Sequence, residues 1–274
     1  MPFVDSNGVR IGYDDLGPRD APALLFLTGW CSSRERWASV AERCSASRRV
    51  LSLEWRGHGS SAHGSGDFGL EEMVTDALTV ADAAGVETFV PCAASHSGFV
   101  AIELRRRYPD RVPRLVHVDW YVIPPPAPYR AVLEQLVTTE GWPVARDTLF
   151  RIWRGGVDTP EIEEALAVMG RHGADMWMRS GREILAGYAR VGSPTAAWAA
   201  LEPSVPVLHV YGQPPAPEFL AAQHEFAAAH PWFTVTKLAG TSHFAMIETP
   251  AEVSAAILAF VGTPSPNAAP GRLP

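Results

Sequence analysis

Short, mostly apolar segments that alternate with amphipathic stretches are the feature that most restricts the fold of this chain. Such segments occupy residues 23–27, 50–53, 89–92, 115–118 and 207–210. A strand that is apolar along its whole length is buried on both faces, as in a parallel sheet covered by helices. The stretch from Leu70 to Ala84 repeats apolar residues at helical spacing and is typical of such a covering helix. The sequence therefore predicts an α/β fold with a mostly parallel, doubly wound central sheet.

The two ends of this pattern differ from its middle. Residues 2–15 read as a hairpin, because Asn7 and Gly8 supply a turn between alternating segments. Residues 233–238 alternate in polarity, which suits an edge strand. A last helix is predicted to run to about residue 261, opened by a capping box of Thr249 and Glu252.

The alternation stops between residues 123 and 200, where the sequence becomes helical throughout. A helical insertion in a parallel-sheet protein usually covers the carboxyl ends of the strands. We therefore expect a core of residues 1–122 and 201–263 with a helical cap of residues 123–200. Residues 264–274 are rich in Pro, Gly, Ser and Ala, and we expect a disordered tail there.

Composition excludes several classes of function. A formal net charge of −7 argues against nucleic-acid binding, and the basic run 105–107 is expected to be a solvated helix face. No signal peptide is visible, and no apolar run reaches the roughly 18 residues of a membrane span. The odd number of cysteines, without a CxxC pair, indicates neither a disulfide framework nor a zinc site. We expect a cytoplasmic protein with reduced thiols, without a nucleic-acid or membrane partner.

The segment around Ser95 carries the first chemical signal. An apolar strand ends at Ala94, Ser95 follows in a tight turn, and a helix begins near Phe99. This is the layout of a nucleophile elbow, whose usual pattern is G-x-S-x-G. Ala93 and Ser97 replace the two glycines, and both are small enough for the turn. By itself the segment is equally compatible with an ordinary strand–helix junction.

Two further residues agree with this interpretation. Asp119 ends the apolar strand 115–118, and His243 follows the last predicted strand, just before the final helix. The order Ser, Asp, His and the positions at strand ends are those of the α/β-hydrolase fold. His243 could instead be a surface residue, but the three placements together predict a triad-like site.

The loop after the first buried strand, Thr28 to Cys31, is expected to contribute the Trp30 backbone N–H to an oxyanion hole. The second N–H would come from His96. His58, in a later loop, is predicted to be structural. Most of the tryptophans in and next to the cap are expected to fill the core, whereas Trp153 could face a pocket and favour a flat aromatic substrate; these tryptophans are Trp120, Trp142, Trp153, Trp177 and Trp198.

With these residues, the sequence resembles the family of cofactor-independent 3-hydroxy-4(1H)-quinolone 2,4-dioxygenases of the α/β-hydrolase superfamily. The resemblance extends over residues 20–262. Its motifs are the segments at 29–31, 95–99, 118–120, 149–153, 175–182, 192–194, 230–233 and 243–244. The cap segments discriminate most, because a generic esterase is not expected to share them.

The resemblance implies that the substrates are an N-heteroaromatic compound and O2. The 3-hydroxy-4-oxo ring would open, carbon monoxide would leave and an N-acyl- or N-formylanthranilate would remain, without metal or flavin. It also implies that His243 is the general base, that Asp119 orients it and that Ser95 donates a hydrogen bond. The implied substrate-binding residues are Trp30, Ser32, His96, Phe99, Trp120 and Trp153.

Some questions stay open at the level of sequence. Ser32 replaces a histidine that family members carry, and Ser97 replaces a frequent glycine, so substrate preference is uncertain. The C2 substituent could be hydrogen, methyl or a longer alkyl chain, with hydrogen or methyl favoured. The main alternative function is a serine hydrolase (an esterase or carbon–carbon bond hydrolase) with Ser95 as nucleophile. A non-catalytic ligand-binding relative is the third hypothesis, and the intact Ser95, Asp119 and His243 argue against it.

Overall fold

The computed structural model of the chain describes residues 1–19 and 23–262. An eight-stranded sheet forms its centre, with the order β1-β2-β4-β3-β5-β6-β7-β8. β2 is antiparallel to β1 and β4, and the other neighbouring pairs are parallel, which confirms the predicted sheet. The strands are β1 (Phe3–Ser6), β2 (Val9–Leu16), β3 (Ala23–Leu27), β4 (Val50–Leu53), β5 (Phe89–Ala94), β6 (Leu115–Val118), β7 (Val207–Tyr211) and β8 (Phe233–Lys237).

Burial follows the sequence pattern strand by strand. Every residue of β3 to β7 is buried, as expected for strands covered on both faces. β8 lies at the sheet edge and is mostly only half-buried. The β1–β2 hairpin turns at Asn7 and Gly8, which both have positive φ, at 52° and 82°. Asn and Gly tolerate this conformation best, so the turn forms where the sequence predicts it.

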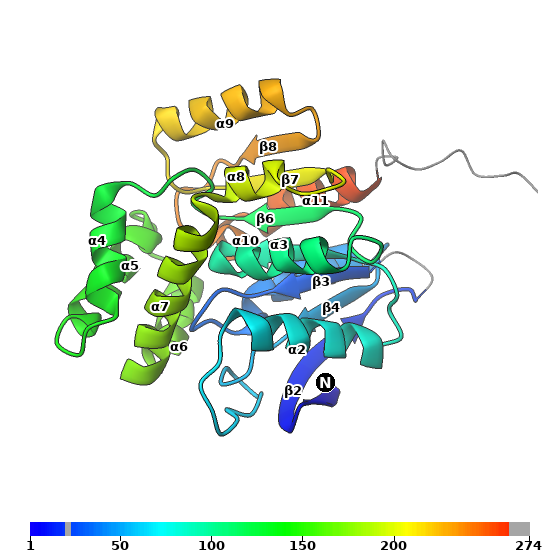
Figure 1. Cartoon of the computed structure of the whole chain (residues 1–274), viewed down its shortest axis with the longest axis horizontal. Coiled ribbons are helices and arrows are strands. Elements are labelled where there is room, and N and C mark those ends of the chain that lie inside the picture. The colour runs from blue at the N-terminus through cyan, green and yellow to red at the C-terminus, as the bar shows by residue number, and fades with distance from the viewer. Residues whose placement is uncertain (20–22, 263–274) are drawn as a thin grey trace, which may run out of the picture.

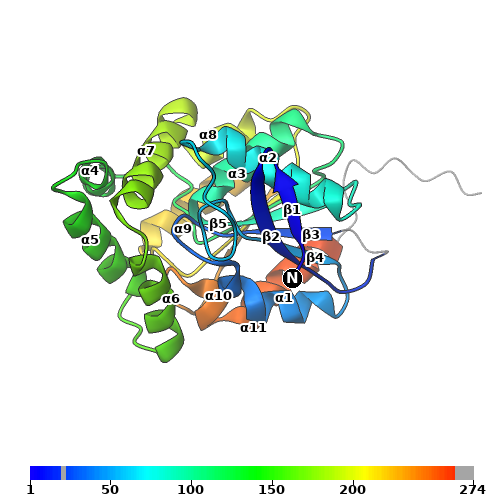
Figure 2. The ribbon, with the colours of Figure 1, turned by 90° about the horizontal axis from the view of Figure 1, so that it is seen from below.

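Helices cover both faces of the sheet, as the two views in Figures 1 and 2 show. One face carries α1 and α11 with the short α10, and the opposite face carries α2, α3 and α8. α9 packs against the edge strand β8. These helices are α1 (Ala38–Ser45), α2 (Leu70–Ala83), α3 (Gly98–Arg107), α8 (Pro194–Ala199), α9 (Pro217–Ala229), α10 (Ala245–Glu248) and α11 (Pro250–Gly262).

The chain between β6 and β7 is helical, as predicted. Besides α8 it forms α4 (Ala127–Leu136), α5 (Trp142–Arg154), α6 (Pro160–Gly170) and α7 (Ala174–Val191). In Figures 1 and 2 these four helices gather to one side of the sheet, and we use the name cap for residues 123–200. No helix within residues 1–19 and 23–262 has the length and apolar character that a membrane crossing requires. The predicted tail, 264–274, lies outside the described residues.

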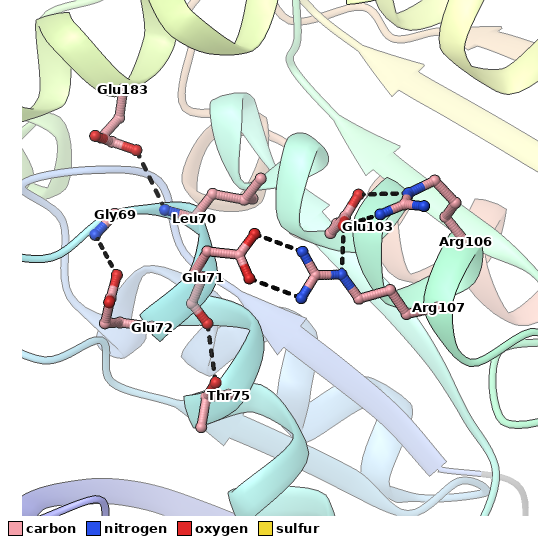
Figure 3. Close-up of polar contacts among 9 residues, drawn as sticks. All are labelled: Gly69, Leu70, Glu71, Glu72, Thr75, Glu103, Arg106, Arg107 and Glu183. Atoms are coloured by element: carbon pink, nitrogen blue, oxygen red, sulfur yellow. Dashed lines mark hydrogen bonds and ion pairs between the residues drawn. The ribbon is translucent and has the colours of Figure 1, made fainter. Parts of the chain in front are cut away.

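Polar contacts join the cap to the core on the side of α2. Glu183 of α7 accepts a hydrogen bond from the Leu70 N–H at 3.2 Å, at the beginning of α2 (Figure 3). Two arginines of the same helix, Arg179 and Arg182, bind the carboxylate of Asp67 at 2.7 and 2.8 Å. The cap is thereby tied to the loop that precedes α2.

The basic run at the end of α3 differs from the sequence prediction in one residue. Arg106 and Arg107 pair with Glu103 of their own helix, and Arg107 also pairs with Glu71 of α2 (Figure 3). Arg105, however, is buried and donates to backbone carbonyls, including that of Pro203 at 2.7 Å. The prediction of a solvated face was therefore wrong for Arg105, because backbone carbonyls beyond the helix end accept its guanidinium protons.

The predicted capping box before α11 is not formed. The Thr249 hydroxyl donates to the carbonyl of Ala245 at 3.3 Å, and Glu252 accepts from the N–H of Ala239 at 3.4 Å. The short helix α10 directly precedes α11 and supplies the carbonyl that captures Thr249. The helix nevertheless begins at Pro250, where the sequence places it.

Candidate active site

Three loops at the carboxyl ends of neighbouring strands contain residues in the left-handed backbone conformation. Cys31 follows β3, Ser95 follows β5 and Asp119 follows β6, with φ of 60°, 53° and 48°. Residues with a Cβ rarely adopt such angles, and they cluster at functional sites where the surroundings hold them. The strained residues thus mark the edge of the sheet that the sequence motifs point to.

The turn at Ser95 has the strand–turn–helix form that the sequence predicts. Ser95 opens the short 3-10 helix η2 (Ser95–Ser97) between β5 and α3. Ser97, the departure from the usual glycine, donates its hydroxyl to the carbonyl of Thr28 and so ties this turn to the loop after β3. The glycine that the turn does require is Gly98, where a Cβ would lie 2.2 Å from the Trp120 ring.

The Ser95 hydroxyl belongs to a hydrogen-bonded chain that reaches into the cap. Its Oγ lies 3.0 Å from His96 Nδ1, and His96 Nε2 lies 2.9 Å from the hydroxyl of Tyr129 on α4. Burial lowers the pKa of His96 to about 3, so this ring is neutral and has one N–H and one acceptor nitrogen. If the Tyr129 hydroxyl donates to His96 Nε2, then the Nδ1–H of His96 donates to Ser95 Oγ. The hydroxyl proton of Ser95 is then free to point to the cavity.

The Asp119 carboxylate is held by backbone N–H groups. Its Oδ1 accepts from Gly212 at 2.7 Å and from Gln213 at 3.3 Å, and its Oδ2 accepts from Ala245 at 2.9 Å. Burial raises the pKa of Asp119 to about 6, against the lowering effect of these hydrogen bonds. The resemblance implies that Asp119 orients His243, but within the described residues the carboxylate makes no hydrogen bond to the His243 ring. It instead anchors the loop of His243 through Ala245.

His243 is held by the cap. Its backbone N–H donates to the carbonyl of Trp153 at 2.7 Å, and its imidazole stacks on the Trp153 indole with centroids 5.3 Å apart and planes at 21°. Burial, followed by the positive charge of Arg36, lowers the pKa of His243 well below its usual value. The imidazole is therefore neutral near pH 7, which is the form that accepts a proton.

The loop after β3 approaches Ser95 closely. A Cβ on Gly29 would lie 3.5 Å from that of Ser95, and the Trp30 N–H has no acceptor in the described part of the chain. The His96 N–H lies in the first turn of a helix, where N–H groups lack helical partners. The use of both N–H groups as donors to a ligand oxygen beside Ser95 stays a prediction.

His58 is structural, in line with its interpretation from sequence. Its Nε2 accepts from the backbone N–H of Cys31 at 2.9 Å, and its Nδ1 lies 2.9 Å from the carbonyl of Arg56. Burial lowers the pKa of His58 to about 3 and keeps the ring neutral, so that it can serve both contacts. The ring holds the residue next to Trp30 in its left-handed conformation.

Two connected cavities meet at Ser95, His96 and His243. The inner cavity has a volume of only about 20 Å³ and lies between the loop after β3 and the cap, lined by Gly29, Trp30, Arg36, Leu133, Leu136, Leu149, Met169, Trp177, Ser180 and Ile184. The outer cavity has a volume of about 430 Å³ and a mainly apolar wall that includes Asp119, Trp120, Tyr121, Pro126, Pro128, Val132, Thr148, Ile152, Gln213 and Pro214. Tyr129 and Trp153 line both.

The structure separates the predicted substrate-binding residues into two groups. Trp30, His96, Trp153 and Trp120 line one or both of these cavities. Phe99 and Ser32 do not: Phe99 packs edge-on against Trp120 at 4.8 Å, and Ser32 lines a separate groove on the far side of Arg36. Phe99 therefore supports a wall of the site from behind.

Sequence analysis missed two polar residues of the cavity, Tyr129 and Arg36. Tyr129 follows a proline-rich segment of the cap, and Arg36 lies in the short 3-10 helix η1 (Arg34–Trp37) after the Trp30 loop. Neither belongs to a motif, so no signal in the sequence identifies them. Together with His243 and Ser95 they form a site with one neutral base and several donors in an otherwise apolar cavity. Such a site can deprotonate and hold a flat ring that bears an acidic hydroxyl.

Comparison with known proteins agrees with this geometry. The family model described as alpha/beta hydrolase fold matches residues 22–184. The chain is 36% identical over 251 residues to a 2-heptyl-3-hydroxy-4(1H)-quinolone dioxygenase of Mycobacteroides abscessus, which covers 91% of this chain and 93% of that protein. It is 30% identical to the 1H-3-hydroxy-4-oxoquinoline 2,4-dioxygenase of Pseudomonas putida, over 95% of this chain and 99% of that protein.

A solved structure leads to the same group of proteins. It is described as the basis for recognition and ring-cleavage of the Pseudomonas quinolone signal by AqdC, in complex with its product. The TM-score is 0.91 at 34% identity, with 96% of this chain and 100% of that chain covered. The similarity includes the cap as well as the sheet, because nearly the whole of both chains is superposed.

Proposed function

The chain belongs to the 3-hydroxy-4-quinolone 2,4-dioxygenase family of the α/β-hydrolase fold and is a ring-cleaving dioxygenase; from this we propose that it cleaves a 2-alkyl-3-hydroxy-4(1H)-quinolone with His243 as the base. The observation that carries the proposal is the meeting of two cavities at His243 and Ser95. The ring and its alkyl chain both occupy the outer cavity, where Trp120 and Trp153 can flank the ring beside His243; the inner cavity, at about 20 Å³, has room only for a group as small as a substrate oxygen.

The reaction begins when His243 takes the proton of the substrate 3-hydroxyl. Ser95 and the N–H groups of Trp30 and His96 donate to substrate oxygens and hold the ring. The resulting electron-rich anion can give an electron to O2 itself. C3 then leaves as carbon monoxide with its own oxygen, the C2–C3 and C3–C4 bonds break, and C2 and C4 each gain one oxygen atom of O2. The product is an N-acylanthranilate, and the atoms of substrate and O2 are all accounted for.

The outer cavity supports a longer alkyl chain at C2, in place of the hydrogen or methyl that the sequence favoured. Its wall is largely apolar, and each buried CH2 group is worth about 0.8 kcal/mol. A chain of several carbons would fill space between α4 and α5 that a methyl group leaves open. The relatives whose names include a 2-heptyl substituent support the same choice.

The test uses 3-hydroxy-4(1H)-quinolones with hydrogen, methyl or heptyl at C2. We expect carbon monoxide release on adding air to the anaerobic complex, and the highest kcat/KM for the heptyl compound. Val132→Trp fills the outer cavity and should lower kcat/KM for the heptyl compound at least tenfold more than for the methyl compound. Equal values for the three compounds would contradict the assignment of the alkyl chain.

The hydrolase alternative is tested in the same assay. A serine hydrolase would turn over activated esters and would lose this activity in Ser95→Ala. The proposed dioxygenase needs no acyl-enzyme, so Ser95→Ala should retain ring cleavage at a reduced rate. Hydrolysis of esters without carbon monoxide release from any quinolone would replace the proposal by its alternative.

The proposed location is the cytoplasm. The three cysteines, Cys31, Cys44 and Cys92, are buried and unpaired, which suits a reducing compartment. A small N-heteroaromatic compound and O2 are the proposed partners. Cell fractionation with activity measurements checks the location.

A further inference from the structure

Arg36 is a buried cation at the inner cavity that the proposed reaction has not used. It is only 7% exposed. One guanidinium nitrogen lies 3.0 Å from the sulfur of Met169, and the Cζ lies 4.6 Å from the centre of the Phe244 ring. The Nε is buried and has no hydrogen-bond partner in residues 1–19 and 23–262.

The lack of a carboxylate partner distinguishes Arg36 from Arg34 and Arg56. Arg34 pairs with Glu54 at 2.7 Å, and Arg56 pairs with Asp76 at 2.6 Å. No carboxylate oxygen among the described residues lies within 4.0 Å of the Arg36 guanidinium. Burial lowers the pKa of Arg36 to about 10, so the group is still charged near pH 7. A buried charge without a partner is unfavourable.

The position of the Arg36 guanidinium indicates which anion would pair with it. Arg36 lines the inner cavity together with Trp30, Ser95 and His243. Its guanidinium rests on Phe244, the residue that directly follows His243. The ionisable groups that face it are Asp119, Cys31 and His243, and only Asp119 contributes a nearby negative charge. A substrate anion formed beside His243 would therefore lie near a cation that no described carboxylate contacts within 4.0 Å.

We propose that Arg36 is a further substrate-binding residue, which balances the negative charge of the quinolone ring after its 3-hydroxyl has lost a proton to His243. The inference rests on the proposed function and adds a residue to it. The step moves one proton from the substrate oxygen to the imidazole, so the cavity gains an oxyanion and an imidazolium. Arg36, which lines the inner cavity beside His243, supplies the opposite charge for the oxyanion.

The test compares Arg36→Met and Arg36→Lys with the wild-type enzyme. Anaerobic binding of 3-hydroxy-2-methyl-4(1H)-quinolone is followed by absorbance, which distinguishes the neutral ring from its anion, across pH 5 to 9. We expect Arg36→Met to hold the anion about tenfold more weakly, which raises the pKa of the bound 3-hydroxyl by about one unit. Arg36→Lys, which keeps the charge, should restore most of the effect.

Two controls separate charge from folding. Arg43→Met removes the same charge from an exposed position of α1 and should leave the titration unchanged. Binding of 2-methyl-4(1H)-quinolone, which lacks the acidic hydroxyl, should change less than twofold in Arg36→Met. If Arg36→Met binds this analogue normally and titrates the 3-hydroxyl like the wild type, the inference is overturned. Failure of the wild-type enzyme to release carbon monoxide would instead overturn the proposed function.

Discussion

The hydroxyl of Ser95 lies 3.0 Å from Nδ1 of His96, the next residue in the chain. A nucleophilic serine normally donates its proton to the catalytic histidine, which here would be His243. In this structure the neighbouring ring occupies that oxygen, and the Tyr129 hydroxyl holds the ring from the cap. The arrangement suits a serine that donates to a ligand oxygen.

Substitutions of Ser95 and His243 should therefore differ in their effect. We expect Ser95→Ala to lower kcat about tenfold, because one hydrogen bond to the substrate is lost. His243→Ala should lower kcat at least about a thousandfold, because it removes the base. Single-turnover absorbance after mixing with O2 measures both. Equal losses in the two variants would contradict a supporting role for Ser95.

Tyr129→Phe should weaken catalysis while leaving substrate binding intact. The ring would keep its stacking with His96, and only the hydrogen bond to Nε2 would be lost. A net contribution of about 0.5–1.5 kcal/mol corresponds to a two- to tenfold lower kcat at constant KM. Tyr108→Phe, which removes a hydroxyl from an exposed tyrosine at the end of α3, is the matched control. A rise in KM alone would show that Tyr129 acts on binding.

The activity should have an acidic limit near pH 6. The Asp119 pKa is raised to about 6, whereas that of His243 lies well below its usual value. As pH falls through 6, Asp119 becomes neutral first, and its hydrogen bond from the Ala245 N–H, which anchors the loop of His243, weakens. Below pH 6 we expect log(kcat/KM) to fall by one unit for each pH unit. Above pH 6 it should not depend on the protonation of His243, which stays neutral there.

Asp119→Asn tests this assignment. The residual kcat/KM of this variant should not decline near pH 6, because the titrating carboxyl is gone. A decline that persists at the same pH in this variant would assign it to another group.

Gly98→Ala should destabilise the turn that carries Ser95. The added Cβ would lie 2.2 Å from the ring of Trp120, the neighbour of Asp119. Overpacking of this kind costs about 1–3 kcal/mol, which urea unfolding measures. Gly170→Ala is the matched control, since its Cβ would meet only Phe150, at 3.9 Å. Equal stability of the two variants would mean that Trp120 moves away freely.

Sequence predicted most of the sheet because burial on both faces leaves an unmistakable apolar pattern. The bounds of β3, β4 and β6 match the predicted segments, and β5 and β7 extend them by one or two residues. The functional residues at strand ends could also be predicted, because parallel strands place their carboxyl ends at one edge of the sheet. Ser95, Asp119 and His243 were found in this way, and each lines the outer cavity.

The contacts between distant segments could not be predicted. Arg36 meets Met169 across the core–cap boundary, and Tyr129 meets His96 from another helix, so both depend on how the cap packs. The position of Ser32 depends on the left-handed backbone conformation of Cys31, which cannot be predicted from the residue type. Arg105 looked solvated because a run of arginines usually is, and only the folded chain brings carbonyls around it.

Trp153 holds His243 twice, through its carbonyl and through its ring. The wall of the binding cavity and the proposed proton acceptor are therefore held together and must move together. A bulkier ring cannot be admitted by shifting this tryptophan without also moving the imidazole away from the hydroxyl it must reach. The substrate range is consequently easier to change through residues of α4 that line the outer cavity, such as Val132, because substitutions there leave the position of His243 unchanged.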